Sequence, residues 1–381
     1  MSVHADMLIR DGSVIDPARG YANTADILVR GNRIIGLAAG DTAEAAKIVD
    51  ASGCLVVPGL IDYHTHLFHG GTEIGIHPDS ALLPQGVTTA VDQGSAGVAN
   101  CDSFFRTVVN QSQVRIFAHL HVSPTGLTTT RFPEPVDPSL FDLERSRSLM
   151  KEYSGVLIGL KIRQSKRVVG DLGLKPLAAT VRMAEAIGCR VVVHTTDPPE
   201  GTAELASMLR PGDVYTHMYQ GSGHTILDDQ GKVRQGIFAA RNRGVLFDTA
   251  DGRVHYGFSV ARTAIANGFL PDIISTDVTR ASLFEDSVFG LPHIMSKYLG
   301  LGVSLQDVVK ACTATPAGLI GMTGKLGTLA PEAYADITIL QLQQKPIVFK
   351  DTFGELLHCN QLLVPKMTIL SGRVAYRSTE F

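Results

Sequence analysis

The sequence has few cysteines, almost no excess of either charge and no long apolar run. The cysteines are odd in number and widely spaced, without a Cys-x-x-Cys pair, which argues against a disulfide framework and a cysteine-based zinc site. A formal net charge of −3 gives no electrostatic reason to expect nucleic acid or an anionic membrane as a partner. No apolar stretch reaches the roughly 18 residues of a transmembrane helix.

The chain is long and rich in apolar residues and glycine. Its 381 residues are 44% hydrophobic and include 38 glycines, so a large core and many tight turns are expected. This length suits one large α/β barrel with a minor domain. The first residues show no basic region followed by an apolar run, so we expect no signal peptide. We expect a cytoplasmic protein that forms homo-oligomers.

Both ends of the chain show short β-strand patterns. In the first part, Gly31-Asn32 separates two apolar runs in the manner of a tight hairpin. Residues 335–340 and 364–376 show strand patterns of the same kind. We therefore predict that the two ends form one small β-sandwich. The predicted domains are residues 1–54 and 326–381 for the sandwich and residues 55–325 for the barrel.

The middle of the chain alternates apolar runs with helical patterns. This alternation predicts an α/β fold of the (β/α)8 or TIM-barrel type. Periodicity alone would also allow an open, doubly wound sheet. The predicted strands are residues 55–64, 87–92, 115–122, 155–162, 190–194, 214–217, 245–248 and 273–277.

The ends of these strands carry side chains that bind metals or transfer protons. His64 and His66 follow the first apolar run and, two residues apart on a strand, point to the same side. Two neighbouring imidazoles suit a divalent transition metal such as zinc. Active sites of such barrels lie at the carboxyl ends of the strands. We therefore predict one site from His64, His66, Lys161, His194, His217 and Asp277.

Lys161 is the unusual member of this group, because a protonated lysine has no lone pair for a metal. Addition of CO2 would turn the amine into a carbamate, an anion with two oxygens that can bridge two metals. The alternative is an ion pair with a nearby carboxylate such as Asp277. The sequence leaves both possibilities open.

Five motifs resemble the amidohydrolase superfamily, and more closely its dinuclear-zinc branch of dihydroorotases, hydantoinases, isoaspartyl dipeptidases and N-acyl-D-amino acid deacylases. They are DYHTH, GLKIR, VVVHT, YTHMYQG and ISTDV. The resemblance implies that a metal-bridging hydroxide attacks the substrate, with Asp277 as general base and then general acid. It also implies two divalent metal ions, zinc, bridged by a CO2-derived carbamate on Lys161, with His64, His66 and Asp277 on one and His194 and His217 on the other.

Other residues bear on the substrate. Dihydroorotases typically carry an arginine two residues beyond the second histidine of the pair, where this chain has Phe68. Arg163 could replace it by pairing with a substrate carboxylate, or it could form a salt bridge with loop acids. We also predict His121 and Tyr219 as substrate contacts.

The phrases GLKIRQS and FGLPHIMSKYLGLG resemble a subgroup of deacetylases, often labelled dihydroorotase or adenine deaminase, that act on acetylated α-substituted carboxylic acids. We therefore predict hydrolysis of an acetyl amide or ester of a small carboxylate. A cyclic-amide hydrolase of hydantoinase or dihydroorotase type is one alternative. A deaminase is disfavoured because such enzymes usually use one metal and lack the bridging lysine. A non-catalytic hydantoinase-like scaffold is disfavoured by the complete ligand set.

Overall fold

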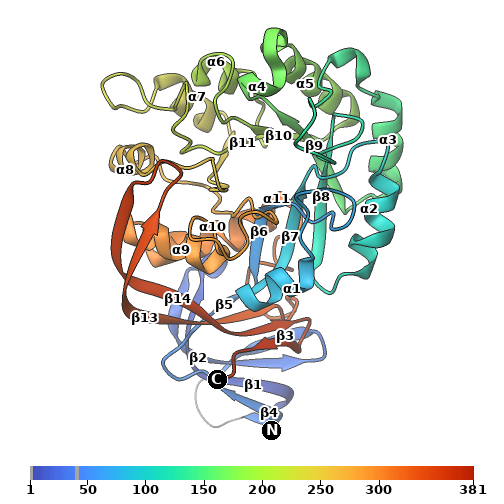
Figure 1. Cartoon of the computed structure of the whole chain (residues 1–381). Coiled ribbons are helices and arrows are strands. Elements are labelled where there is room, and N and C mark those ends of the chain that lie inside the picture. The colour runs from blue at the N-terminus through green and yellow to red at the C-terminus, as the bar shows by residue number, and fades with distance from the viewer. Residues whose placement is uncertain (1–2, 39–42) are drawn as a thin grey trace.

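A seven-stranded parallel sheet forms the centre of the molecule (Figure 1). The computed structural model describes residues 3–38 and 43–381, and each strand of this sheet pairs with the next one along the chain. All residues of the first two strands are buried, as expected for a parallel sheet covered on both faces. The strands are β6 (Leu60–Thr65), β7 (Val87–Gln93), β8 (Arg115–His121), β9 (Leu157–Arg163), β10 (Arg190–His194), β11 (Val214–Thr216) and β12 (Leu246–Asp248).

Residues 273–278 take the place of the predicted eighth strand. Single parallel bridges join this segment to the end of β12 and to the end of β6, so it closes the barrel. The predicted (β/α)8 architecture is confirmed, but the prediction of a regular eighth strand was wrong. Asp277 has a φ of +52°, which is outside the extended region. Its N–H donates to the His64 carbonyl oxygen at 2.8 Å.

Helices follow most of the strands and lie outside the sheet (Figure 1). In α5 (Lys175–Ile187), Leu177, Thr180 and Ala184 recur at helical spacing and are buried, and the helix ends before Gly188 with a φ of +82°. No helix in the described part of the chain combines the length and apolar character that a bilayer crossing requires. The other helices are α1 (Pro78–Leu82), α2 (Cys101–Thr107), α3 (Leu143–Glu152), α4 (Lys166–Val169), α6 (Thr202–Ser207), α7 (Gln235–Asn242), α8 (Phe258–Ala266), α9 (Leu291–Gly300), α10 (Leu305–Ala311) and α11 (Ala314–Leu319), with 3₁₀ turns at Pro17–Arg19, Leu83–Gln85, Val109–Gln111, Pro138–Leu140 and Gly170–Leu172.

Both ends of the chain contribute to a second, mixed sheet, which confirms the predicted small β domain. Its strand order is β15-β14-β13-β5-β1-β2-β3, with β4 paired to β1. Gly31 and Asn32 join β2 to β3, so the predicted hairpin is also confirmed. Buried side chains from both chain ends, such as Ile27 and Ile337, share one core. The strands are β1 (Val3–Asp16), β2 (Tyr21–Arg30), β3 (Arg33–Ala38), β4 (Ala43–Asp50), β5 (Leu55–Pro58), β13 (Ile337–Lys350), β14 (Leu356–Leu370) and β15 (Arg373–Arg377).

The first predicted strand, residues 55–64, is divided between the two sheets. β5 pairs with β1 and β13 in the small domain, and β6 starts the barrel. Gly59 lies at the break, where its N–H donates to the Asp336 carbonyl oxygen at 2.7 Å. A Cβ at Gly59 would lie only 2.3 Å from Thr88 Oγ1, so the close approach requires glycine. The prediction of one continuous strand was therefore wrong.

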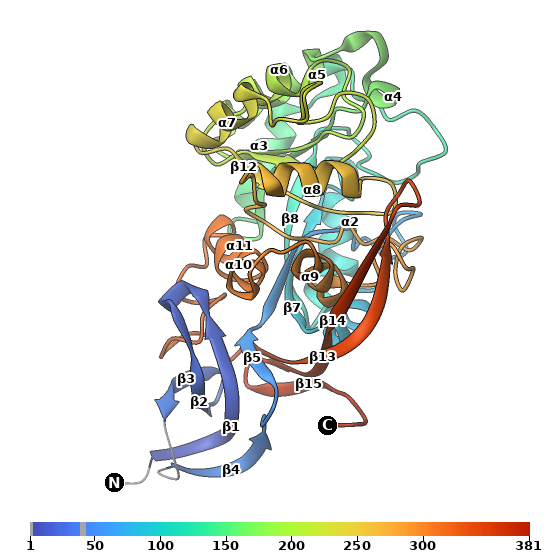
Figure 2. The same ribbon diagram turned by 90° about the vertical axis from the view of Figure 1, so that its left-hand side faces the viewer.

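The β13–β14 hairpin extends from the small domain toward the barrel (Figure 2). Its strand β14 packs beside α9. At its tip, the Phe258 N–H donates to Asp351 Oδ2 at 2.8 Å, and the Thr352 N–H donates to the Tyr256 carbonyl oxygen at 3.3 Å. The hairpin thereby holds the loop that follows β12.

Candidate active site

The six side chains predicted at the strand ends lie together at one end of the barrel, and all six residues are buried. Lys161 Nζ on β9 lies 3.3 Å from His64 Nε2 on β6. His217 Nε2, just beyond β11, lies 2.7 Å from His194 Nδ1 at the end of β10. The ring centroids of His64 and His217 are 5.2 Å apart, so the two pairs are neighbours.

The Asp277 carboxylate stands between histidines on two sides. Its Oδ1 atom lies 3.1 Å from His66 Nε2 and 3.6 Å from His64 Nε2. Its Oδ2 atom lies 3.6 Å from His255 Nε2. In the described part of the chain, these imidazoles, and not Lys161, lie within 4 Å of the Asp277 carboxylate oxygens.

Two of the six residues have a left-handed backbone. His217 has a φ of +62° and Asp277 a φ of +52°, conformations that cost a non-glycine residue about 1–3 kcal/mol and cluster at active sites. At His217 the chain turns immediately after β11, and Nδ1–H donates to the Ala250 carbonyl oxygen at 2.7 Å. This hydrogen bond leaves the Nε2 lone pair directed into the site.

Each of the four histidines has one ring nitrogen held by an outer partner and the other directed inward. A metal-binding histidine shows this arrangement, because the outer hydrogen bond fixes its tautomer and ring orientation. The outer contacts are His64 Nδ1 with Asp248 Oδ2 at 3.3 Å, His66 Nδ1 with Ser95 Oγ at 3.2 Å, His194 Nε2 with Ser165 Oγ at 2.9 Å, and His217 Nδ1 with the Ala250 carbonyl oxygen at 2.7 Å.

Burial favours the neutral form of three of these imidazoles. It lowers the pKa of His64, His194 and His217 well below the usual value of 6.5, and neighbouring cations lower it further. A neutral imidazole retains the lone pair that a metal requires. The same burial raises the pKa of Asp248 to about 8, although the hydrogen bond from Ser275 opposes the shift.

Lys161 is also altered by its buried position. Burial lowers the pKa of its amine to about 7, although Asp277 and Asp248 oppose the shift. A large fraction of the amine is therefore neutral near pH 7, and a neutral amine is the form that adds CO2. The stem of Lys161 packs on Gly94, where an added Cβ would lie 2.8 Å from Lys161 Cβ.

Two groups of three side chains place ligand atoms within 4.8 Å of one another. Imidazole nitrogens and carboxylate oxygens in such groups fit a zinc ion. The donors present therefore suit the divalent metals that the sequence analysis predicts. The groups are His64, His217 and Asp277, and His194, His217 and His255.

His255 is a residue of this cluster that the sequence analysis left unassigned. It comes from the loop after β12, where no strand end marks its position. Burial lowers the pKa of His255 to about 4, although Asp277 opposes the shift. The one available signal was its place in a loop at the carboxyl end of a predicted barrel strand.

Two of the predicted substrate-binding residues share a partner, Glu134. Arg163 Nη1 donates to Glu134 Oε2 at 3.0 Å, and His121 Nε2 lies 3.1 Å from Glu134 Oε1. Burial alone would raise the pKa of Glu134, but His121 and Arg163 hold it below its usual value. Of the two possibilities for Arg163, a salt bridge with a loop acid is present. Glu134 was missed, because a loop carboxylate gives no periodic signal.

The third predicted substrate contact, Tyr219, does not join the cluster. Its ring is fully buried beside Tyr256 and Tyr298, and its hydroxyl donates to the Phe269 carbonyl oxygen at 2.7 Å. β11 ends at Thr216, so strand alternation does not continue to Tyr219. The Tyr219 hydroxyl is therefore already paired within the protein, with a residue outside the six strand-end side chains.

The sequence and the fold of this chain are both similar to those of known proteins. Residues 55–374 match the model of the Amidohydrolase family. The chain is 33% identical to a deacetylase of Agrobacterium fabrum over 376 residues, covering 97% of this chain and 91% of the relative. It is 31% identical to a solved dihydroorotase structure with a TM-score of 0.89, covering 98% of both chains. A solved adenine deaminase structure is 27% identical with a TM-score of 0.90, covering 98% of this chain and 100% of that one.

Proposed function

The chain belongs to the amidohydrolase family, and we propose that this hydrolase removes an acetyl group from an amide or ester of a small α-substituted carboxylate. The observation that carries the proposal is the buried group of inward-facing imidazoles with Lys161 and Asp277. The similarity to a deacetylase over nearly the whole chain supports an acetyl group as the group that is removed.

We propose that His64, His66 and Asp277 hold one divalent metal ion and that His194 and His217 hold another. Two such ions, when bound, lower the pKa of water toward neutrality and polarise a substrate carbonyl. The neutral fraction of the Lys161 amine, which follows from its pKa of about 7, supports a carbamate at this position. The nitrogen and oxygen donors favour zinc.

Asp277 is the proposed proton carrier. Its side chain is 9% exposed and lies at the junction of the histidine groups, within reach of a water molecule beside them. We propose that this carboxylate accepts a proton from the attacking water and then delivers it to the leaving nitrogen or oxygen. Burial of the surrounding residues limits competing proton exchange with bulk water.

Arg163 is the proposed contact for the substrate carboxylate. His121, whose two nitrogens face Ser123 and Glu134, is proposed to position Glu134 beside Arg163. Glu134 accepts a hydrogen bond from Nη1 of Arg163. The remaining N–H groups of the planar guanidinium can donate to a substrate carboxylate. The Arg163 side chain is 24% exposed, so a small ligand can reach it. Phe68, at the position of the dihydroorotase arginine, is instead buried with its ring 5.1 Å from that of Phe104.

A cyclic-amide hydrolase is the second candidate. The similarity to a solved dihydroorotase structure over 98% of both chains favours it. The same proposed residues would open a ring by adding water across an internal amide. The two reactions differ in their products, because deacetylation releases acetate and ring opening yields a single larger acid.

The first prediction concerns metal content. The purified protein should carry about two divalent metals per chain, chiefly zinc, because the proposed ligand groups offer imidazole nitrogens and a carboxylate at two neighbouring positions. Elemental analysis of protein prepared without chelators measures this. Dialysis against a strong chelator should abolish hydrolysis, and zinc should restore it. Full activity in metal-free protein would contradict the proposal.

The second prediction concerns the substrate. A screen of N-acetyl amino acids and O-acetyl hydroxy acids with zinc-loaded protein should release acetate, whereas hydantoins and dihydroorotate should react slowly. On the best substrate, Arg163→Met should raise KM by roughly tenfold or more, as expected for loss of a charged contact. Arg167→Met, at an exposed position on α4, is the matched control and should leave KM unchanged. Ring opening without acetate release would favour the second candidate.

A further inference from the structure

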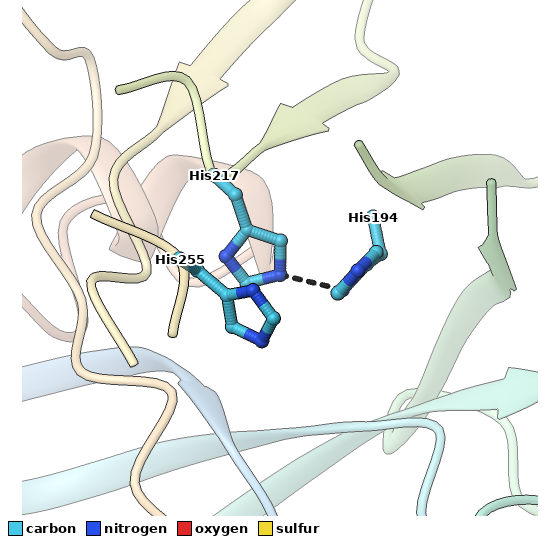
Figure 3. A group of neighbouring side chains, drawn as sticks. All are labelled: His194, His217 and His255. Carbon is cyan, nitrogen blue, oxygen red and sulfur yellow. Dashed lines mark hydrogen bonds between the residues drawn. The ribbon is translucent and has the colours of Figure 1, made fainter. Parts of the chain in front are cut away.

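Three imidazoles form a compact group on one side of the candidate active site. His194 ends β10, His217 follows the adjacent strand β11, and His255 reaches them from the loop after β12 (Figure 3). The His255 ring centroid lies 4.8 Å from that of His194 and 4.3 Å from that of His217. Each of the three offers a ligand atom within 4.8 Å of the others.

The nitrogens of His255 follow the pattern of the other inward-facing histidines. Thr196 Oγ1 lies 2.8 Å from Nδ1 and holds one side of the ring. Nε2 lies 3.6 Å from Asp277 Oδ2, so the second nitrogen faces the carboxylate that His64 and His66 also face. The side chain is 15% exposed, which leaves little water to compete for it.

The loop that carries His255 is held at several points. The buried Lys297 Nζ lies 3.0 Å from the buried Asp251 Oδ2, which ties the start of the loop to α9. A Cβ at Gly252, whose φ is +55°, would lie 2.5 Å from Asp277 Oδ2, so the backbone packs on the catalytic carboxylate. After His255, the Gly257 N–H donates to the Tyr219 carbonyl oxygen at 3.0 Å. Contacts before and after His255 therefore hold the loop that carries its imidazole.

Two other histidines from the loops and strand ends, His121 and His224, lack this arrangement. His121 accepts the Ser123 N–H at Nδ1 and has Glu134 opposite Nε2, so both of its nitrogens have protein neighbours outside the imidazole group. His224 is exposed in the loop after β11. The outer hydroxyl partner and the inward nitrogen therefore distinguish His255 from His121 and His224.

We propose that His255 is a third imidazole ligand at the metal position formed by His194 and His217. This inference rests on the proposed function, because it assumes that a metal binds there. Three protein ligands with a further position open to water or substrate form the usual arrangement of a catalytic zinc site. With His255 included, the His194–His217 position has enough protein donors to hold zinc without the Lys161 carbamate.

The test compares His255→Ala and His255→Asn with wild type, and uses His224→Ala as the matched control. Zinc per chain and zinc affinity by chelator competition are the readouts, together with the visible spectrum of the cobalt-substituted proteins. Asparagine at position 255 keeps a polar group near Thr196. Thermal unfolding of each variant shows whether it is folded. Both His255 variants should bind the second zinc at least about 10- to 100-fold more weakly, and their cobalt spectra should change. His224→Ala should match wild type.

A second comparison uses the Lys161→Ala background. The zinc at the His194–His217 position should remain in Lys161→Ala and should be lost when His255→Asn is added, so zinc per chain should fall by about one between these two variants. Unchanged zinc affinity and cobalt spectrum in folded His255→Asn would overturn the assignment, as would retention of that zinc in the double variant. Both outcomes leave the proposed function standing if the wild type binds two metals. A wild type that binds none would overturn the proposed function as well.

Discussion

Asp277→Asn should reduce turnover by roughly 100- to 10,000-fold, the range typical for loss of a general acid–base group. Asparagine keeps the size of the side chain and one oxygen that can contact a metal, but it cannot accept and return a proton. Metal content should stay near that of wild type, because the other proposed ligands remain in place. Turnover of the best substrate and zinc per chain, measured on the same preparation, separate the two roles.

The control for this change is Asp229→Asn, which removes a carboxylate from an exposed loop and should leave turnover unchanged. The Asp277 backbone has a φ of +52°, and asparagine is among the residues that tolerate this region best. A folding defect is therefore not expected. Normal turnover with both metals bound would show that another group moves the proton. Loss of both metals would make Asp277 primarily a structural ligand.

The strand-end residues could be predicted because a parallel barrel places the carboxyl ends of all its strands on one face. An apolar run marks a strand, and its carboxyl end marks the catalytic face, so His64, His194 and Asp277 were expected together and lie together. The same reasoning could not detect the break at Gly59. Apolar residues stand on both sides of that break, and only the different pairing partners of β5 and β6 show that two sheets meet there.

Residues in loops could not be predicted, because their positions depend on contacts far away in the sequence. His255 reaches the site through a loop held by the ion pair between Asp251 and Lys297 and by the tip of the β13–β14 hairpin. Glu134 reaches Arg163 from the loop that follows β8. No periodicity in the sequence marks either residue.

The second large effect is expected for Lys161→Ala. Removal of the amine removes the proposed carbamate and its two oxygens, so zinc content should fall below two per chain. Turnover should decrease by more than the roughly 10- to 100-fold that loss of an outer metal partner costs. A short carboxylic acid such as acetate or propionate has the two oxygens of a carbamate. Added to the variant, it should partly restore both zinc binding and turnover.

The low pKa of Lys161 adds a pH dependence to this prediction. Its value of about 7 means that the amine changes from protonated to neutral as the pH rises through neutrality, and only the neutral amine adds CO2. Metal-free wild type should therefore regain activity with zinc and bicarbonate more completely at about pH 8 than at about pH 6. Lys166→Ala, which removes an exposed lysine from α4, should behave as wild type. An unaffected Lys161→Ala enzyme would instead mean that Lys161 serves only as a buried positive charge beside Asp277 and Asp248.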